Sequence, residues 1–559
     1  MMANLPREKN ALIRRRHWRI RLFVPLLVFV LPAFLSLAAF YLGCDSVETP
    51  TIALSTSTGM LEVSDVQTLI AHAVEQGERL GVKASIAITD REGNVLGVFN
   101  MNGIPSPDIT VTNPIVGAIA KARTAAYLSS NQHGFSTLTA CYITRNHFPP
   151  NIDNTAAGPL FGVPRSSIGG GDIQPNGDLA AGRPPLDAQG LTGVPGGVPI
   201  YKNNLLAGGI GVSVDVPSQA ALDKILCCCG GMLPDETIAL GAVLGGYETP
   251  VNLRGDGIFI DGIRFLFANT APPAANFTLA FSALGSRGAV DARFPIRATP
   301  PPKFPQTPAN ELFREVNLGA GFDFRIRGGT SLTSDDVRKI ITQAATQAAK
   351  TRAAIRRPAG VPAQVFIAVV NVGDGRVLGI GRTPDATLFS FDVSAQKART
   401  ALAFSDPGNL LGQMVRRELG LAANAGLAIS SRAVGFLAQD FYPPGITREE
   451  QALDRPIAPG PFFIMPPQRN GDEFIFQKNL GTQPYGNGIT IFPGGVPLYK
   501  GSQLVGGIGI SGDGVDQDDL ICFAGALGFE PPPEIRCDQF KYRDIRLPYV
   551  KFPRQPEIK

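Results

Sequence analysis

Two lysine–threonine pairs with the same spacing occur in this chain of 559 residues. Lys121 and Thr124 stand three residues apart, and Lys397 and Thr400 repeat the pair. Residues three apart in a helix share one face, so each pair would place a cation beside a hydroxyl group. That combination suits an anionic ligand. The alternative is a helix whose lysine is solvated and whose threonine packs on a sheet.

Arginines and glycines accompany both pairs. Arg123 and Arg399 lie on another side of the predicted helices and could bind a carboxylate through two parallel hydrogen bonds. Further along, Gly-Gly pairs fall in predicted strands, where glycine marks a bulge or a close approach by backbone or ligand. Tight packing between helix and sheet explains these glycines equally well. The pairs are Gly208 with Gly209, and Gly506 with Gly507.

Histidine is scarce, and His147 is the candidate metal ligand. The chain has four histidines, and the other three are His17, His72 and His133. Imidazole is the commonest metal ligand in proteins, so a histidine-bound metal is possible only in the first half of the chain. His72 lies beside an apolar helix face, which favours packing. No acid–base pair recurs in both halves, so the sequence does not predict catalysis.

An acidic cluster follows the second Gly-Gly block. Clustered carboxylates can bind Ca²⁺, but acids also stabilise the start of a helix through its dipole. We favour the helix start, because the segment 215–218, which we take as the counterpart in the first half, is poor in acids. The cluster consists of Asp513, Asp516, Asp518 and Asp519.

Whole blocks of sequence are repeated. The block Gly-Gly-Val-Pro-Ile-Tyr-Lys at 196–202 returns at 494–500 with one substitution. A duplication of this length indicates two copies of one domain. We place the first copy at 58–268 and the second at 330–552. The Pro-rich stretch 269–329 between them has the composition of a linker.

Each copy mixes helices with hairpins. Apolar residues at helical spacing predict a helix that begins near Ser64, with Ser64 and Gln67 as a capping box. Alternating residues and turn signals predict hairpins. The pattern predicts an α+β domain, an antiparallel sheet with helices packed on it. In the first copy the expected strands are 84–89, 95–99, 198–201 and 205–214, with a short hairpin at 258–265 and a second helix at 114–128.

The order of these blocks resembles the GlcG/HbpS-like haem-binding family. The resemblance is carried by a strand ending in Asp90, then Lys-Ala-Arg-Thr-Ala at 121–125, Gly-Gly-Val-Pro at 196–199 and Gly-Gly-Ile-Gly-Val-Ser at 208–213. The same order returns in the second copy, with Asn371 in place of Asp90 and Ile510 in place of Val212. It implies two tandem profilin-like domains, haem as the ligand, oligomer formation and a location outside the cytoplasm. Under this resemblance the lysine and threonine pairs would meet a haem propionate or the iron.

The N-terminus has the features of an export signal. Basic residues precede an apolar run from Leu22 to Gly43, which ends at Cys44. Positive charge before such a run keeps the N-terminus in the cytoplasm and sends the rest across the membrane. Residues 1–44 are therefore a signal peptide ending in a lipobox-like cysteine, with Cys44 lipidated, or an uncleaved membrane anchor. In both cases the protein is extracytoplasmic and tethered to a membrane.

The charge distribution argues against a nucleic-acid partner. The first 43 residues carry seven Lys/Arg and one acid, so the remainder carries −2 of the total net charge of +4. A nucleic-acid-binding body would be basic. Three interpretations stay open: a haem-binding protein that captures or buffers haem, a sensory module for another small ligand, and a structural scaffold for a partner or a homo-oligomer.

Overall fold

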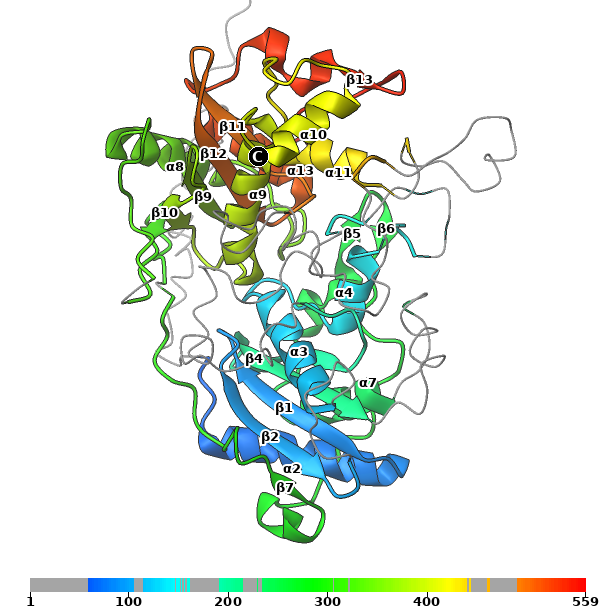
Figure 1. Ribbon diagram of the computed structural model, residues 1–559. Helices are drawn as coiled ribbons and strands as arrows, with labels where there is room; N and C mark the ends of the chain where they lie inside the picture. The colour runs from blue at the N-terminus through cyan, green and yellow to red at the C-terminus, as the bar shows by residue number, and fades with distance from the viewer. Residues whose placement is uncertain are drawn as a thin grey trace, which may run out of the picture. The chain divides into compact units, whose positions relative to one another are not determined.

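The computed structural model of the chain contains two similar halves (Figure 1). The predicted signal segment and Cys44 lie outside the described residues, and so do Cys227 and Cys228. The structure describes residues 59–104, 114–145, 147–150, 152, 155, 158–160, 191–214, 229, 234–304, 306–319, 322–439, 442–443, 460–462 and 490–558.

The first half is built on a five-stranded antiparallel sheet. Its strand order is β3-β4-β1-β2-β7. The β3–β4 hairpin turns at Asn203 and Asn204, both with positive φ, as a tight hairpin turn requires. The strands are β1 (Ala84–Asp90), β2 (Val95–Met101), β3 (Gly197–Lys202), β4 (Leu205–Val214) and β7 (Gly288–Val290), and a separate short hairpin joins β5 (Phe259–Ile260) to β6 (Ile263–Arg264).

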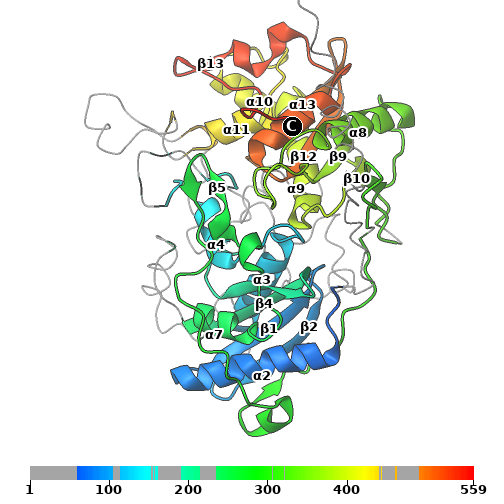
Figure 2. The same ribbon diagram turned by 180° about the vertical axis from the view of Figure 1, so that it is seen from behind.

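Helices cover both faces of this sheet. Helix α3 (Pro114–Tyr127) packs on β1, β3 and β4. Helices α2 (Val63–Leu80) and α7 (Pro234–Ala242) pack together over the other face, where Ile210 and Val212 of β4 join their apolar side chains in one core. Figure 2, seen from behind, shows α2 crossing the face opposite α3. Helix α4 (Thr137–Ile143) follows α3.

The second half repeats the same plan. Its sheet has the order β11-β12-β9-β10-β8, with α9 (Phe389–Ser405) on one face and α8 (Ser334–Ala348) with α13 (Val515–Gly525) on the other. The predicted α+β class and the tandem arrangement are therefore confirmed. The remaining elements are β8 (Arg314–Glu315), β9 (Val365–Asn371), β10 (Val377–Arg382), α10 (Leu410–Glu418), α11 (Ser431–Leu437), β11 (Gly495–Lys500), β12 (Gln503–Gly512), β13 (Lys541–Tyr542) and β14 (Ile545–Arg546).

Two features differ from the sequence expectations. The stretch 269–329, for which the composition predicts a linker, supplies a strand to each sheet: β7 pairs with β2, and β8 pairs with β10. Helix α2 begins two residues earlier than a Ser64 cap predicts, because its N-cap residue is Glu62. Its capping box joins Glu62 and Asp65 rather than Ser64 and Gln67, because the Asp65 carboxylate accepts the Glu62 amide hydrogen at 2.6 Å.

A buried arginine joins the two copies within the compact unit formed by residues 58–559. The Arg356 guanidinium of the second copy is fully buried and donates to Asp513 and to Asp385 Oδ2, the latter at 2.9 Å. It also reaches Ser130 Oγ and Gln132 Oε1 of the first copy, each at 3.2 Å. The buried Arg356 side chain thus bonds to residues of both copies and links them.

One disulfide is present in the described residues. Cys141 of α4 is bonded to Cys229, which is 88 residues further along the chain. Cys522 and Cys537 are buried free thiols. As for membrane crossing, the helices in the described part of the chain are all too short or too polar to span a bilayer.

Candidate functional site

Each copy buries one lysine–aspartate ion pair between a helix and the sheet. Lys121 Nζ lies 2.5 Å from Asp235 Oδ2 and 2.8 Å from the Val212 carbonyl oxygen. In the second copy Lys397 Nζ lies 2.7 Å from Asp518 Oδ2 and makes the equivalent bond to the carbonyl of β12. All four charged side chains are buried, so each pair ties α3 or α9 to the start of α7 or α13 through the sheet.

The first glycine of each Gly-Gly-Val-Pro block closes this site. Gly196 and Gly494 have φ values of 116° and 109°, in the region that favours glycine. A Cβ on Gly494 would stand 3.0 Å from Lys397 Nζ and 2.8 Å from Asp518 Cβ, and Gly196 has the same neighbours in the first copy. Any side chain here would push against the ion pair.

Each pair leaves one carboxylate oxygen without a partner. Oδ1 of Asp235 and Oδ1 of Asp518 are buried and accept no hydrogen bond from any described residue. Burial raises the pKa of Asp518 to about 7, although the Lys397 ammonium opposes this shift. An unsatisfied buried acceptor is costly, and its presence in both copies marks a position at each site where a further donor could bind.

The threonines of the predicted site are engaged with the backbone. Thr124 Oγ1 donates to the Ala120 carbonyl at 2.8 Å and accepts the Thr192 amide hydrogen at 2.9 Å. Thr400 accepts the Thr490 amide hydrogen at the same distance. Both side chains are fully buried. They therefore anchor the chain entering β3 and β11 to the central helix.

The arginines between them hold a turn. Arg123 Nε donates to the Gly93 carbonyl at 3.0 Å, and Arg399 Nε donates to the Gly375 carbonyl at 2.9 Å. Both glycines have positive φ in the turn between the first two strands of their sheet. The arginine of each repeated block thus stabilises a turn between two strands, whereas the lysine forms an ion pair with an aspartate.

The paired glycines bring helix and strand into contact. A Cβ on Gly209 would stand 2.1 Å from the Ala122 carbonyl oxygen of α3, and one on Gly507 would stand 2.4 Å from the Ala398 carbonyl oxygen of α9. Gly208 and Gly506 instead face the backbone of the neighbouring strand, at 1.9 Å from Thr89 O and 2.4 Å from Val370 O. Close backbone packing is what these glycines permit.

The histidines stand apart from the ion pairs. His147 is half-buried, and its Nδ1 lies 2.9 Å from the Thr155 carbonyl oxygen. His133 is fully buried between Ser130 Oγ and the Leu128 carbonyl, and burial lowers its pKa to about 3. In the ranges that the structure describes, no group of three or more potential ligands could hold a metal ion. His147 as a metal ligand stays a prediction.

Sequence patterns alone do not reveal the aspartates as partners of the lysines. The prediction that Asp518 marks the start of a helix is confirmed, because Asp518 lies in the first turn of α13. The counterpart of that helix is α7 rather than 215–218, and Asp235 with Glu236 matches Asp518 with Asp519 at a constant offset of 283. A search for acids at equal offset in both copies would have found the pair.

The chain is thus a tandem α+β protein, and each of its two domains buries one lysine–aspartate pair under the central helix. The family described as "Haem degrading protein HbpS-like" matches residues 61–221 and 332–526, more than half of the chain. The chain therefore belongs to the HbpS-like family, with one match in each copy.

Solved structures cover about one copy each. The protein ORFY of Klebsiella pneumoniae is 16% identical, with a TM-score of 0.21, over 34% of this chain and 92% of its own. A PduOC–haem complex is 20% identical, with a TM-score of 0.19, over 36% and 96%. A double mutant of Streptomyces reticuli HbpS is 22% identical, with a TM-score of 0.17, over 36% and 97%. No curated protein matches the chain.

Proposed function

We propose that this protein binds haem outside the cytoplasm, where it captures or buffers haem while tethered to a membrane by its N-terminal segment. The observation that carries the proposal is the match of the HbpS-like family to both copies. Both copies retain the matched blocks, the buried ion pair and the paired glycines, so we expect one haem-binding unit in each copy.

The disulfide supports the proposed location. Disulfides form and persist in oxidising compartments and are rare in the cytoplasm. The Cys141–Cys229 bond therefore agrees with the export signal that the sequence of residues 1–44 predicts. Cell fractionation tests this part, with labelling by a fatty-acid analogue in the wild type and in Cys44→Ala. Label in the membrane fraction that Cys44→Ala loses supports a lipid anchor, and a soluble cytoplasmic protein contradicts the tether.

The predicted ligand residues do not offer haem a free group as they are placed. Lys121 and Lys397 are held by carboxylates, and Thr124 and Thr400 by backbone groups. A haem site built from them would first require these contacts to open. Their part in haem binding stays a prediction, and we assign no step to it. Haem, when bound, would supply the iron and the light absorption by which binding is measured.

The experiment is a haem titration of the full chain, followed by absorbance at the Soret band. Saturation at a defined number of haem molecules per chain supports the proposal. If haem produces no change beyond that seen with an unrelated protein, the proposal fails.

A second candidate function is an interaction scaffold. One observation favours it: the lysine and arginine of both repeated blocks make hydrogen bonds within the protein. A scaffold would show a mass that rises with protein concentration in the absence of haem. A single mass over a hundredfold range of concentration would contradict self-association.

A further inference from the structure

The two copies differ in one groove, which is filled in the first copy and open in the second. In each copy the groove runs between the first helix and the helix after the fourth strand, α2 with α7 and α8 with α13. Asp65 of α2 and Asp336 of α8 are equivalent residues, because each accepts the amide hydrogen of its helix's N-cap residue and binds a lysine, Lys202 or Lys500. Counting along the helices from equivalent aspartates therefore pairs the residues of the two grooves. The matched groove positions are His72 with Gln343, Glu75 with Thr346, Arg79 with Lys350, and Gly241 with Ala524.

In the first copy the chain fills this groove with its own segment 271–281, which has no helix or strand before Phe281. The Phe277 ring stacks on His72 with centroids 4.7 Å apart, and the Arg79 guanidinium lies 4.6 Å above the same ring. Pro273 and Phe277 approach Gly241 so closely that a Cβ there would stand 3.1 and 3.2 Å from them. A proline and an aromatic ring four residues apart are thus the two anchors of the segment.

Backbone hydrogen bonds fix the same segment along its length. Glu75 Oε2 accepts the amide hydrogens of Thr278 and Leu279, at 2.8 and 2.7 Å. Arg79 Nη2 donates to the Asn276 carbonyl at 2.8 Å. Glu75 and Arg79 are also bonded to each other, one turn apart on α2. Charged side chains therefore bind both the amide hydrogens and a carbonyl oxygen of this segment, and hydrogen bonds to charged groups are stronger than those between neutral groups.

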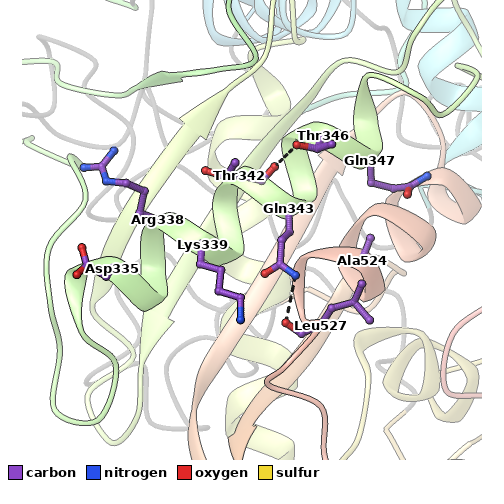
Figure 3. Close-up of a pocket in the computed structure, with 9 residues that line it drawn as sticks. All are labelled: Asp335, Arg338, Lys339, Thr342, Gln343, Thr346, Gln347, Ala524 and Leu527. Carbon is purple, nitrogen blue, oxygen red and sulfur yellow. Dashed lines mark hydrogen bonds between the residues drawn. The ribbon is translucent and has the colours of Figure 1, made fainter.

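In the second copy the groove is open. It is an open depression of about 500 Å³ between α8 and α13, lined by Gln343, Thr346, Gln347, Ala524 and Leu527 among others. Figure 3 shows these side chains around the depression, with Gln343 Nε2 bonded to the Leu527 carbonyl. The C-terminal segment takes another path, because Phe552 packs on Phe523 and the Ile558 amide bonds to Lys350 O.

We propose that the α8–α13 groove is a docking site for an extended segment of a partner protein that carries a proline and, four residues later, an aromatic residue. The first copy shows the bound form of such a segment on the same scaffold. The same segment of a second copy of this chain is already engaged on its own α2 and α7, so the occupant is another protein.

The charges around the open groove indicate the chemistry of the partner. Thr346 replaces the carboxylate of Glu75, and Arg338 is already paired with Glu315 at 2.9 Å. Lys339 lines the groove and Lys350 flanks it, with Asp335 as the acid in the lining. A partner segment with acidic residues beside its aromatic anchor complements this charge. Ala524 carries a methyl group where Gly241 has none, so the proline and aromatic side chains of a bound segment would have to sit a few tenths of an ångström further out than Pro273 and Phe277 do in the first copy.

The test uses a labelled peptide with the sequence of residues 271–281 and the full chain, with binding followed by fluorescence anisotropy. The matched control is the peptide with Phe277→Ala. Ala524→Arg places a long side chain in the groove of the second copy only, so it separates binding there from exchange with the segment of the first copy. We expect saturable binding that the control peptide and Ala524→Arg each weaken at least tenfold.

A gain-of-binding variant guards against misfolding. Thr346→Glu with Lys350→Arg recreates the pair Glu75 and Arg79, and we expect it to tighten binding by roughly tenfold, since two charge-assisted backbone bonds are added. Absence of binding to the wild type, or equal binding by the wild type and Ala524→Arg, would overturn the proposal. So would a concentration-dependent oligomer that Ala524→Arg makes monomeric while peptide binding is unaffected, because the occupant would then be a second copy.

Discussion

Lys397 Nζ lies 2.7 Å from Asp518 Oδ2 in a position where neither side chain reaches solvent. Lys121 and Asp235 repeat the relationship in the first copy. The pair links three elements in each domain: the central helix, the carbonyl edge of the fourth strand and the following helix. A charge pair kept in both copies under the same helix indicates that this link is part of the architecture of both domains.

Breaking this pair from one side should be strongly destabilising. Lys397→Met leaves the Asp518 carboxylate buried without its cation, and we expect a loss of about 3–5 kcal/mol in the free energy of unfolding. Lys397→Met with Asp518→Leu removes both charges and should cost much less than the two single changes summed. Urea unfolding of the four proteins measures the coupling, and strictly additive losses would contradict a direct pair.

Gly494→Ala should be destabilising for two reasons. Alanine is strained at a φ of 109°, and its Cβ would meet the Ile510 carbonyl, Asp518 and Lys397. Gly103→Ala is the matched control, because Gly103 also has a positive φ but has no atom within 4 Å of a Cβ. We expect about 1 kcal/mol for Gly103→Ala and at least about 2 kcal/mol more for Gly494→Ala. Equal losses in thermal unfolding would show that space around Gly494 is unimportant.

Stability should fall with acidification because of His133. Burial lowers the pKa of this imidazole to about 3, below its ordinary value of 6.5, so the folded protein keeps it neutral while the unfolded chain binds a proton. The folded state thus loses stability as the pH falls from about 6.5 towards 3. At pH 4 the loss from this group is about 3 kcal/mol, an order-of-magnitude figure.

His133→Gln isolates that contribution. It keeps a donor and an acceptor for Leu128 and Ser130 but cannot titrate in this range. The difference in unfolding free energy between wild type and His133→Gln should therefore shrink as the pH falls, and His147→Gln serves as the half-buried control. Curves that stay parallel from pH 7 to pH 4 would contradict a neutral buried His133.

Reduction of the disulfide should destabilise the first copy. The Cys141–Cys229 bond closes a loop of 88 residues, and its loss is expected to cost about 3–5 kcal/mol. A reductant should lower the midpoint of unfolding in the wild type but have no effect on the variant with both cysteines changed to alanine. An equal response of both proteins would mean that another thiol is involved.

Local patterns predicted the elements better than the contacts between them. The helix that carries Lys121 and the hairpin around Asn203 and Asn204 follow from periodicity and turn residues, and the structure confirms both. Strands β7 and β8 have three and two residues, too few for an alternating pattern, and they lie in Pro-rich sequence. Such short strands form because their backbone pairs with the edge strand of an existing sheet, β2 or β10, and not because of their own sequence pattern.

The site shows the same division. The lysines could be found because they are repeated within identical blocks. Their partners Asp235 and Asp518 come after insertions of unequal length. The two aspartates are therefore recognised as equivalent only when helices α7 and α13 are aligned with each other. The glycines could be found, and the sequence allowed either close packing or the approach of a ligand; the structure shows that Gly209 faces the backbone of α3.

The most direct test of the proposed function is the haem stoichiometry of the full chain, measured by Soret absorbance as haem is added. The variant Thr124→Ala with Thr400→Ala, compared with the wild type, tests the predicted ligand residues in the same experiment. We predict a saturable Soret shift with up to two haem molecules per chain, one for each copy. A change no larger than that of an unrelated protein, at every haem concentration, would contradict haem binding.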